Sequence, residues 1–190
     1  MEPQLGLGLW NAWPFFVLYW LPMPVLQRAR PDVLRLLNSG EPTAGEKRRR
    51  VFIWLLLLVG FVYALFLPLQ VGTPWFYVGM SVALAGLALF GSAVREMVAW
   101  PDLNRPLTSG AYRFSRHPMY VGAAIMFIGV GVACTSVLFV LYSVVSFAAY
   151  AASAGGEESE CLEHYGAEYS SYLARTPRWL GFPRRDEAAR

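Results

Sequence analysis

Two groups of polar residues stand directly beside long apolar runs, and their types could support chemistry at a membrane surface. The first is His117, which precedes Pro118 and a long uncharged stretch. Proline opens helices at their first turn and keeps the residue before it out of the helical conformation. We therefore predict His117 at the N-terminal mouth of an apolar helix, where free backbone N–H groups can bind a polar ligand. The alternative is a histidine that only caps the helix.

The second group is the carboxylate pair Glu157 and Glu158, which follows the uncharged residues 119–156. Carboxylates at the point where an apolar helix leaves a bilayer are costly to desolvate unless a cation meets them. The pair is therefore expected to face a cationic partner. The alternative is that the two carboxylates stabilise the N-terminus of a new helix through its dipole.

Four uncharged runs must position these residues. The chain is 56% hydrophobic and only 15% charged, which excludes an ordinary soluble globule. A helix needs roughly 20 mainly apolar residues to cross about 30 Å of hydrocarbon. The runs cover residues 9–26, 51–69, 75–94 and 119–156. We predict a proline-kinked first span, two single spans, and a pair of helices in the last run.

The last run is too long for one crossing, because it holds 38 uncharged residues. A turn near residues 134–136 divides it into helices of roughly 15 and 17 residues, each about 22–26 Å long. We therefore predict an all-α polytopic membrane protein with about five hydrophobic segments, of which the last two form a short helical hairpin. In the third span, Gly79, Gly86 and Gly91 allow another helix to approach closely.

The cationic residues divide the chain between two sides of the membrane. All 16 Lys and Arg residues lie in 27–50, 95–118 or 154–190. With five segments these regions share one side, and the opposite side receives none of them. The positive-inside rule then places the N-terminus outside and the C-terminal tail in the cytoplasm. A run of four cations from Lys47 marks the helix end and the topology, with binding to anionic lipids as the alternative.

We predict a single integral-membrane domain over residues 1–190. Its three N-terminal spans occupy 1–94, the half that carries both polar groups occupies 95–182, and a polar tail follows at 183–190. A helical hairpin returns the chain to its starting face, so His117 and the carboxylate pair are expected to line one cytosolic pocket. A cytosolic C-terminal helix is predicted from residues at helical spacing, which are Leu162, Tyr165, Tyr169, Tyr172 and Leu173.

Metal ions and nucleic acids are not expected partners. The net charge of +3 is modest, and no basic stripe interleaves with stacking aromatic residues. The two histidines and two cysteines lack the spacing of metal ligands. They are His117, His164, Cys134 and Cys161.

Four segments of the C-terminal half together resemble one known family. They are Leu107-Thr108-Ser109-Gly110-Ala111-Tyr112, Arg116-His117-Pro118-Met119-Tyr120-Val121-Gly122, Glu157-Glu158 and Tyr165-Gly166-Ala167-Glu168-Tyr169-Ser170-Ser171-Tyr172. Thr176-Pro177-Arg178 follows at a similar spacing. The resemblance covers roughly residues 90–182. It is to the integral-membrane isoprenylcysteine carboxyl methyltransferases and their relatives, the phospholipid N-methyltransferases.

The resemblance implies a methyltransferase that binds S-adenosylmethionine in a cytosolic pocket over the hairpin. Its partners would be membrane lipid and an acceptor that is a lipophilic small molecule or a lipidated molecule. His117, Tyr120 and Glu158 would position the methyl transfer, with no other catalytic group implied. The residues implied to bind the cofactor are Leu107, Tyr112, His117, Pro118, Met119, Tyr120, Glu157 and Glu158.

One departure from the family pattern leaves the acceptor open. Isoprenylcysteine methyltransferases usually carry an arginine shortly before the carboxylate pair, but residues 147–154 contain no cation. An isoprenylcysteine-like carboxylate, a phospholipid amine and a thiol all remain candidate acceptors. A non-catalytic scaffold with the same fold is an alternative. An NADPH-dependent sterol reductase is another, although the acidic residues 157–163 would repel a dinucleotide phosphate.

Overall fold

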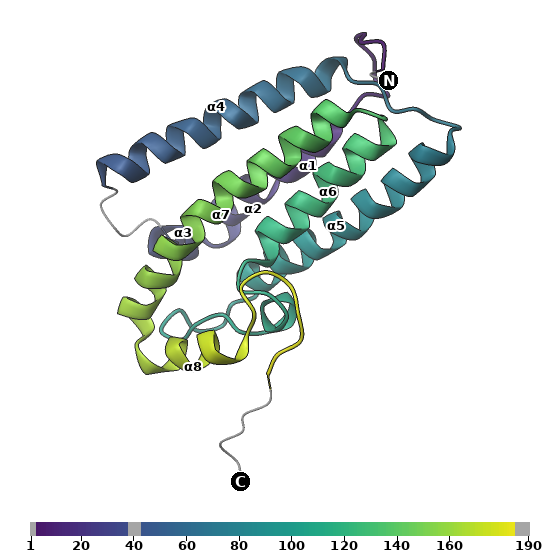
Figure 1. The fold of residues 1–190 in the computed structure, drawn as a ribbon. Coiled ribbons are helices and arrows are strands. Elements are labelled where there is room, and N and C mark those ends of the chain that lie inside the picture. The colour runs from purple at the N-terminus through teal and green to yellow at the C-terminus, as the bar shows by residue number, and fades with distance from the viewer. Residues whose placement is uncertain (1–2, 38–42, 185–190) are drawn as a thin grey trace.

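The computed structural model describes residues 3–37 and 43–184, and the regular elements in these ranges are helical (Figure 1). In chain order they are α1 (Trp13–Trp20), α2 (Pro22–Ala29), α3 (Pro31–Leu37), α4 (Ala44–Phe66), α5 (Pro74–Val98), the 3₁₀ helix η1 (Gly110–Arg113), α6 (Pro118–Ala133), α7 (Val137–Tyr165) and α8 (Ala167–Arg175). Within the described residues, β pairing is limited to one isolated bridge between Asn11 and Pro68. The predicted all-α fold class is confirmed.

Capping side chains and prolines set where the helices begin. The Thr43 hydroxyl accepts a hydrogen bond from the Glu46 backbone N–H at 3.3 Å, and the Glu46 carboxylate accepts one from the Thr43 N–H at 2.7 Å. This reciprocal capping box starts α4. The Ser136 hydroxyl accepts from the Phe139 N–H at 3.1 Å and starts α7. Pro118 is the first residue of α6, where a missing N–H leaves no hydrogen bond unmade.

Three helices of the described chain, α4, α5 and α7, are long and apolar enough to cross a membrane. The apolar helix α6 is shorter, with 16 residues. The predicted first span is divided into α1 and α2, each of eight residues, which meet at Leu21. The division follows because Pro22 and Pro24 have no N–H with which to continue the hydrogen bonds of α1. The chain is an integral membrane protein, and the number of five segments stays a prediction.

The helix α7 is longer than the sequence predicted. The sequence predicts a last apolar segment of roughly 17 residues after the turn at 134–136, whereas α7 runs for 29 residues to Tyr165. Two internal glycines do not end it, because a glycine in a helix costs only about 1 kcal/mol relative to alanine. The helix stops at Gly166, whose φ of 56° is left-handed. The carboxylate pair therefore lies inside a continuous helix, and the alternative of a new helix N-terminus is wrong.

The two ends of the helical bundle differ in charge. At one end the segment before α1, the α4–α5 link and the α6–α7 turn are hydrogen-bonded together. The Ala12 N–H donates to the Leu67 carbonyl at 2.9 Å, and the Gln70 N–H donates to the Ala133 carbonyl at 3.0 Å. The described residues of these three segments include no Lys or Arg. At the opposite end lie the α5–α6 loop, α8 and the C-terminal segment (Figure 1).

Close packing of α5 against α6 depends on glycines. A Cβ atom at Gly86 would overlap the Met126 backbone nitrogen and lie 2.7 Å from the Gly122 carbonyl oxygen. Gly79 meets the backbone of α6 in the same way, so both glycines have the role that the sequence predicted. Gly91 does not share it, because a Cβ there would have no neighbour within 4 Å among the described residues. The close contact holds α6 against α5 from Gly122 to Ala133.

Candidate functional site at the start of α6

His117 lies at the mouth of α6, as the sequence predicted. It is the residue before the first turn, and its backbone N–H donates to the Ser115 hydroxyl at 3.1 Å. Its side chain makes no capping hydrogen bond to the helix, so the alternative of a purely capping histidine is wrong. The side chain is 8% exposed, which places the imidazole inside the protein with two titratable neighbours.

The imidazole of His117 joins the two carboxylates on α7. Its Nε2 atom lies 3.1 Å from Glu158 Oε1, and its Nδ1 atom lies 3.5 Å from Glu157 Oε2. The ring stacks on Tyr120 with a centroid distance of 5.4 Å and an interplanar angle of 8°. The Tyr120 hydroxyl in turn donates a hydrogen bond to Glu157. Residues about 40 positions apart in the sequence thus form one cluster, which we call the polar cluster.

Glu158 is neutralised by cations of the protein itself. Its Oε1 atom lies 3.2 Å from a guanidinium nitrogen of Arg116 and accepts a hydrogen bond of 3.0 Å from Arg178 Nε. A second nitrogen of Arg178 donates to Oε2. The carboxylate side chain is only 10% exposed, so it is a buried anion with two arginine partners. The cationic partner that the sequence required is therefore supplied to Glu158 from within the chain.

Glu157 has a different environment although it is the adjacent residue. Its side chain is 44% exposed, and its ion-pair partner among the described residues is His117. With Tyr120 donating to one oxygen, this carboxylate keeps one side open to a ligand. Of the two carboxylates, Glu157 is the one that can meet an external cation.

A short C-terminal segment, residues 176–182, completes the cluster. The Arg116 N–H donates to the Pro177 carbonyl at 3.1 Å, and the Gly181 N–H donates to the Phe114 carbonyl at 3.0 Å. These bonds hold Trp179 with its ring 5.8 Å from that of His117. Sequence reasoning assigned no role to this tryptophan, although it directly follows the Thr176-Pro177-Arg178 element.

The remaining candidate residues lie beside the polar cluster, against a second hydrophobic core. Leu107, Tyr112 and Met119 pack against a group of buried residues that includes Met97 and Trp100. Burial raises the pKa of the Tyr112 hydroxyl well above its ordinary value, and the charge of Glu157 adds to this. The hydroxyl therefore stays protonated and can donate a hydrogen bond. Pro118, which is fully buried, fixes the first turn between the two groups.

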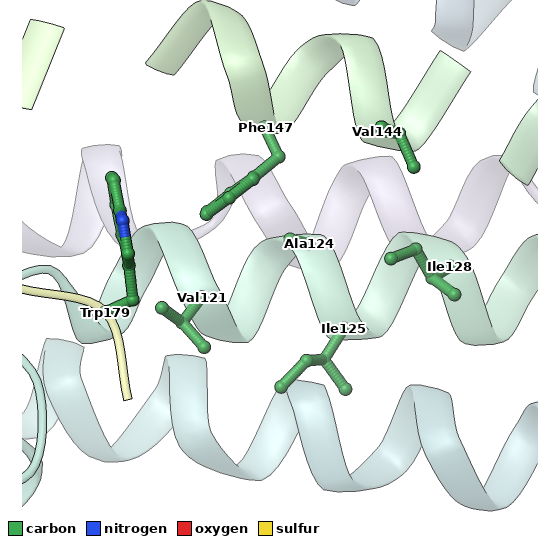
Figure 2. Close-up of a pocket in the computed structure, with 7 residues that line it drawn as sticks. All are labelled: Val121, Ala124, Ile125, Ile128, Val144, Phe147 and Trp179. Atoms are coloured by element: carbon green, nitrogen blue, oxygen red, sulfur yellow. The ribbon is translucent and has the colours of Figure 1, made fainter. Parts of the chain in front are cut away.

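An apolar groove adjoins the polar cluster on the membrane side (Figure 2). It lies between α6 and α7, and its volume is about 340 Å³. Trp179 closes one end of the groove, next to Phe147, whose ring is 5.0 Å from the tryptophan ring. The lining residues are Val121, Ala124, Ile125, Ile128, Val144, Phe147 and Trp179. Trp179 therefore lies between the groove and the ring of His117.

One buried donor of the polar cluster has no partner among the described residues. This donor is the Nε atom of Arg116, whose guanidinium also contacts Glu158. A buried N–H without an acceptor costs stability unless a ligand or water meets it. The cluster therefore offers an exposed carboxylate on one side and an unused guanidinium donor on another.

Two kinds of comparison with known proteins bear on this site. A family model described as phospholipid methyltransferase matches residues 69–168, which are just over half of the chain. Two curated relatives named protein-S-isoprenylcysteine O-methyltransferase, from Mus musculus and Rattus norvegicus, are each 33% identical over 82 residues. This stretch covers 43% of the chain and 29% of each relative, so the chain covers less than a third of their length.

Proposed function

Because this chain belongs to the phospholipid methyltransferase family, we propose that it transfers a methyl group from S-adenosylmethionine to a lipophilic acceptor at the cytoplasmic membrane face. One observation carries the proposal. Trp179 forms a common wall between the polar cluster and the apolar groove, because its ring contacts His117 and also lines the groove. Methyl transfer to a membrane-embedded molecule requires a polar donor site next to an apolar acceptor site, and Trp179 lies at both.

The residues of the polar cluster fit the charges of S-adenosylmethionine. The cofactor carries a sulfonium, an ammonium and a carboxylate. Glu157 presents a half-exposed carboxylate to the two cationic groups, and the buried Arg116 Nε can donate to the cofactor's carboxylate. Glu158 fits less directly, since two arginines already neutralise it. We therefore assign Glu158 a positioning role and Glu157 the direct contact.

The chain's own residues would act mainly by placement. S-adenosylmethionine supplies an electrophilic methyl group when bound, and an in-line displacement depends chiefly on alignment and exclusion of water. The stacked rings of His117 and Tyr120 form a flat wall, and Trp179 covers the His117 ring from the C-terminal segment. The Glu157 carboxylate would attract the positively charged groups of the cofactor. The other predicted residues would contact the cofactor outside this wall. Leu107 would contribute backbone contacts, the Tyr112 hydroxyl a hydrogen bond, and Pro118 and Met119 apolar contacts.

We expect the purified protein to bind S-adenosylmethionine and to transfer a labelled methyl group to a lipophilic acceptor. Isothermal calorimetry in detergent measures the binding, and a screen of lipids, prenyl thiols and amines with labelled cofactor measures the transfer. NADPH in place of the cofactor is the control. A protein that binds neither compound would support the non-catalytic scaffold, and binding of NADPH alone would support a reductase.

The same proposal places the polar cluster on the cytoplasmic side, with the N-terminus outside. Its support is the absence of Lys and Arg from the opposite end of the bundle in the described residues. We expect single cysteines at Leu5 and Phe182, which are 57% and 88% exposed, to react from opposite sides of the cell membrane. An impermeant thiol reagent applied to intact cells, in a background without Cys134 and Cys161, should label only position 5. Labelling of only position 182 would reverse the orientation.

A further inference from the structure

A second and smaller cavity lies inside the bundle behind the polar cluster. Its volume is about 20 Å³, enough for one group the size of a water molecule. Five hydroxyl-bearing residues from α1, α6 and α7 line it, together with apolar neighbours. They are Tyr19, Tyr120, Ser143, Ser146 and Tyr150. We call it the hydroxyl cavity.

The hydroxyl cavity and the apolar groove share part of their walls. Ala124 of α6 and Phe147 of α7 line both. The cavity also shares Tyr120 with the polar cluster, because this tyrosine lines the cavity and donates to Glu157. The cavity and the groove are therefore neighbours, with Ala124 and Phe147 between them, and the cavity also adjoins the methyl donor site.

The charges around the hydroxyl cavity favour a cation. The Glu157 carboxylate lies next to the cavity, because it accepts a hydrogen bond from the Tyr120 hydroxyl. The nearby guanidinium groups of Arg116 and Arg178 contact Glu158 instead. The stretch of α7 that borders the cavity, residues 147–154, has no cation of its own, and the Arg49 guanidinium reaches it only at the Ala152 carbonyl, at 3.3 Å. Aromatic faces also attract cations, and the Tyr120 and Tyr150 rings lie 5.0 Å apart here.

The hydrogen-bonding groups of the cavity favour a head group that donates hydrogen bonds. Ser146 is 7% exposed, and its hydroxyl lies beside that of Tyr142, with neither in a well-formed hydrogen bond among the described residues. Its side chain lines the cavity, so a donor placed there would satisfy it. The hydroxyls of Tyr19 and Tyr150 bond to each other at 2.7 Å, which leaves further oxygen lone pairs available.

We propose that the acceptor is a single-chain lipophilic amine, with its hydrocarbon chain in the apolar groove and its amino group in the hydroxyl cavity. This inference rests on the proposed methyltransferase function. A carboxylate head would be repelled by Glu157, and the described residues that line the cavity include no Lys or Arg. A phosphate-bearing head group is too large for about 20 Å³.

The proposed reaction balances with groups of this site. The acceptor ammonium gives a proton to the Tyr120 oxygen while the Tyr120 proton passes to Glu157, which leaves a neutral amine. The amine nitrogen then forms a bond to the donor's methyl carbon as the sulfur–carbon bond breaks and its electron pair stays on sulfur. The products are a methylated ammonium and a neutral thioether, and Glu157 returns its proton to water.

Binding without cofactor tests the acceptor class independently of activity. We expect dodecylamine to raise the thermal unfolding midpoint of the protein in nanodiscs and to bind at least tenfold more tightly than dodecanoate, dodecanethiol or lysophosphatidylethanolamine. Equal or tighter binding of any of these three would overturn the inference. Ser146→Ala should weaken dodecylamine binding about fivefold. The matched control is Ser81→Ala, because Ser81 is exposed on α5 and bonds only within its own helix among the described residues.

A charge placed in the cavity gives a second test. Tyr150→Arg should reverse the preference, so that dodecanoate binds more tightly than dodecylamine, while Tyr150→Phe keeps the aromatic face and the preference for the amine. An unchanged preference in a folded Tyr150→Arg variant would contradict the inference. If Tyr150→Arg does not fold, the dodecylamine affinity of Ser146→Ala is the test. Methyl transfer to dodecanoate by the parent would overturn the amine assignment alone, whereas absence of S-adenosylmethionine binding would overturn the proposed function.

Discussion

Replacing Glu158 by glutamine is expected to lower the free energy of unfolding by about 3 kcal/mol. Removing one partner of a buried ion pair leaves an uncompensated charge, and typical costs are about 3–5 kcal/mol. Here the uncompensated groups are Arg116, which is 16% exposed, and Arg178, which is 41% exposed. The lower end of the range applies because Arg178 can turn toward water.

Thermal and denaturant unfolding in detergent measure this change, with Glu160→Gln as the matched control. Glu160 lies on the same helix two residues further along, and its side chain is exposed. Hydrogen exchange should in addition rise in residues 176–182 of the Glu158→Gln variant, because Arg178 connects that segment to α7. Equal stability of the Glu158 and Glu160 variants would show that the arginine contacts do not hold the C-terminal segment.

The positions of the apolar helices were largely predictable from the sequence. Uncharged runs mark lipid-facing helices directly, and α4 and α5 correspond to the predicted spans at 51–69 and 75–94. The extent of α7 was not predictable in the same way. Polar residues end an apolar run but not a helix, so the end of the uncharged stretch at Gly156 does not reveal that the helix continues. The backbone stop comes ten residues later, at Gly166.

The candidate site was predictable in its members but not in their partners. The family-like motif indicated His117 and the two carboxylates, and the structure brings these side chains within 3.5 Å. The split between Glu157 and Glu158 depends on Arg178 and Arg116, which lie 20 and 42 positions from Glu158 in the sequence. Helix packing and the path of the C-terminal segment create these contacts. No local pattern distinguishes a carboxylate that meets two arginines from its neighbour that meets none among the described residues.

Replacing Glu157 by glutamine is expected to weaken S-adenosylmethionine binding about 10- to 100-fold, with little change in stability. A charge-assisted contact at a partly desolvated site contributes roughly 1.5–3 kcal/mol, which corresponds to this loss of affinity. The stability effect is small because the Glu157 side chain is 44% exposed and glutamine can still accept the hydrogen bond from Tyr120. Isothermal calorimetry with the cofactor measures the affinity, and thermal unfolding of the same sample measures the stability.

His117→Ala should act on binding in the same direction, because it removes the ring that stacks on Tyr120. The fold should persist, since Glu158 keeps both arginine partners. His164→Ala is its matched control, because His164 is exposed near the end of α7. The two adjacent carboxylates would then differ in their effects. Glu157→Gln would change cofactor binding, whereas Glu158→Gln would chiefly change stability. Parent-like affinity in both His117→Ala and Glu157→Gln would show that the cofactor binds elsewhere, even in a protein that transfers methyl groups.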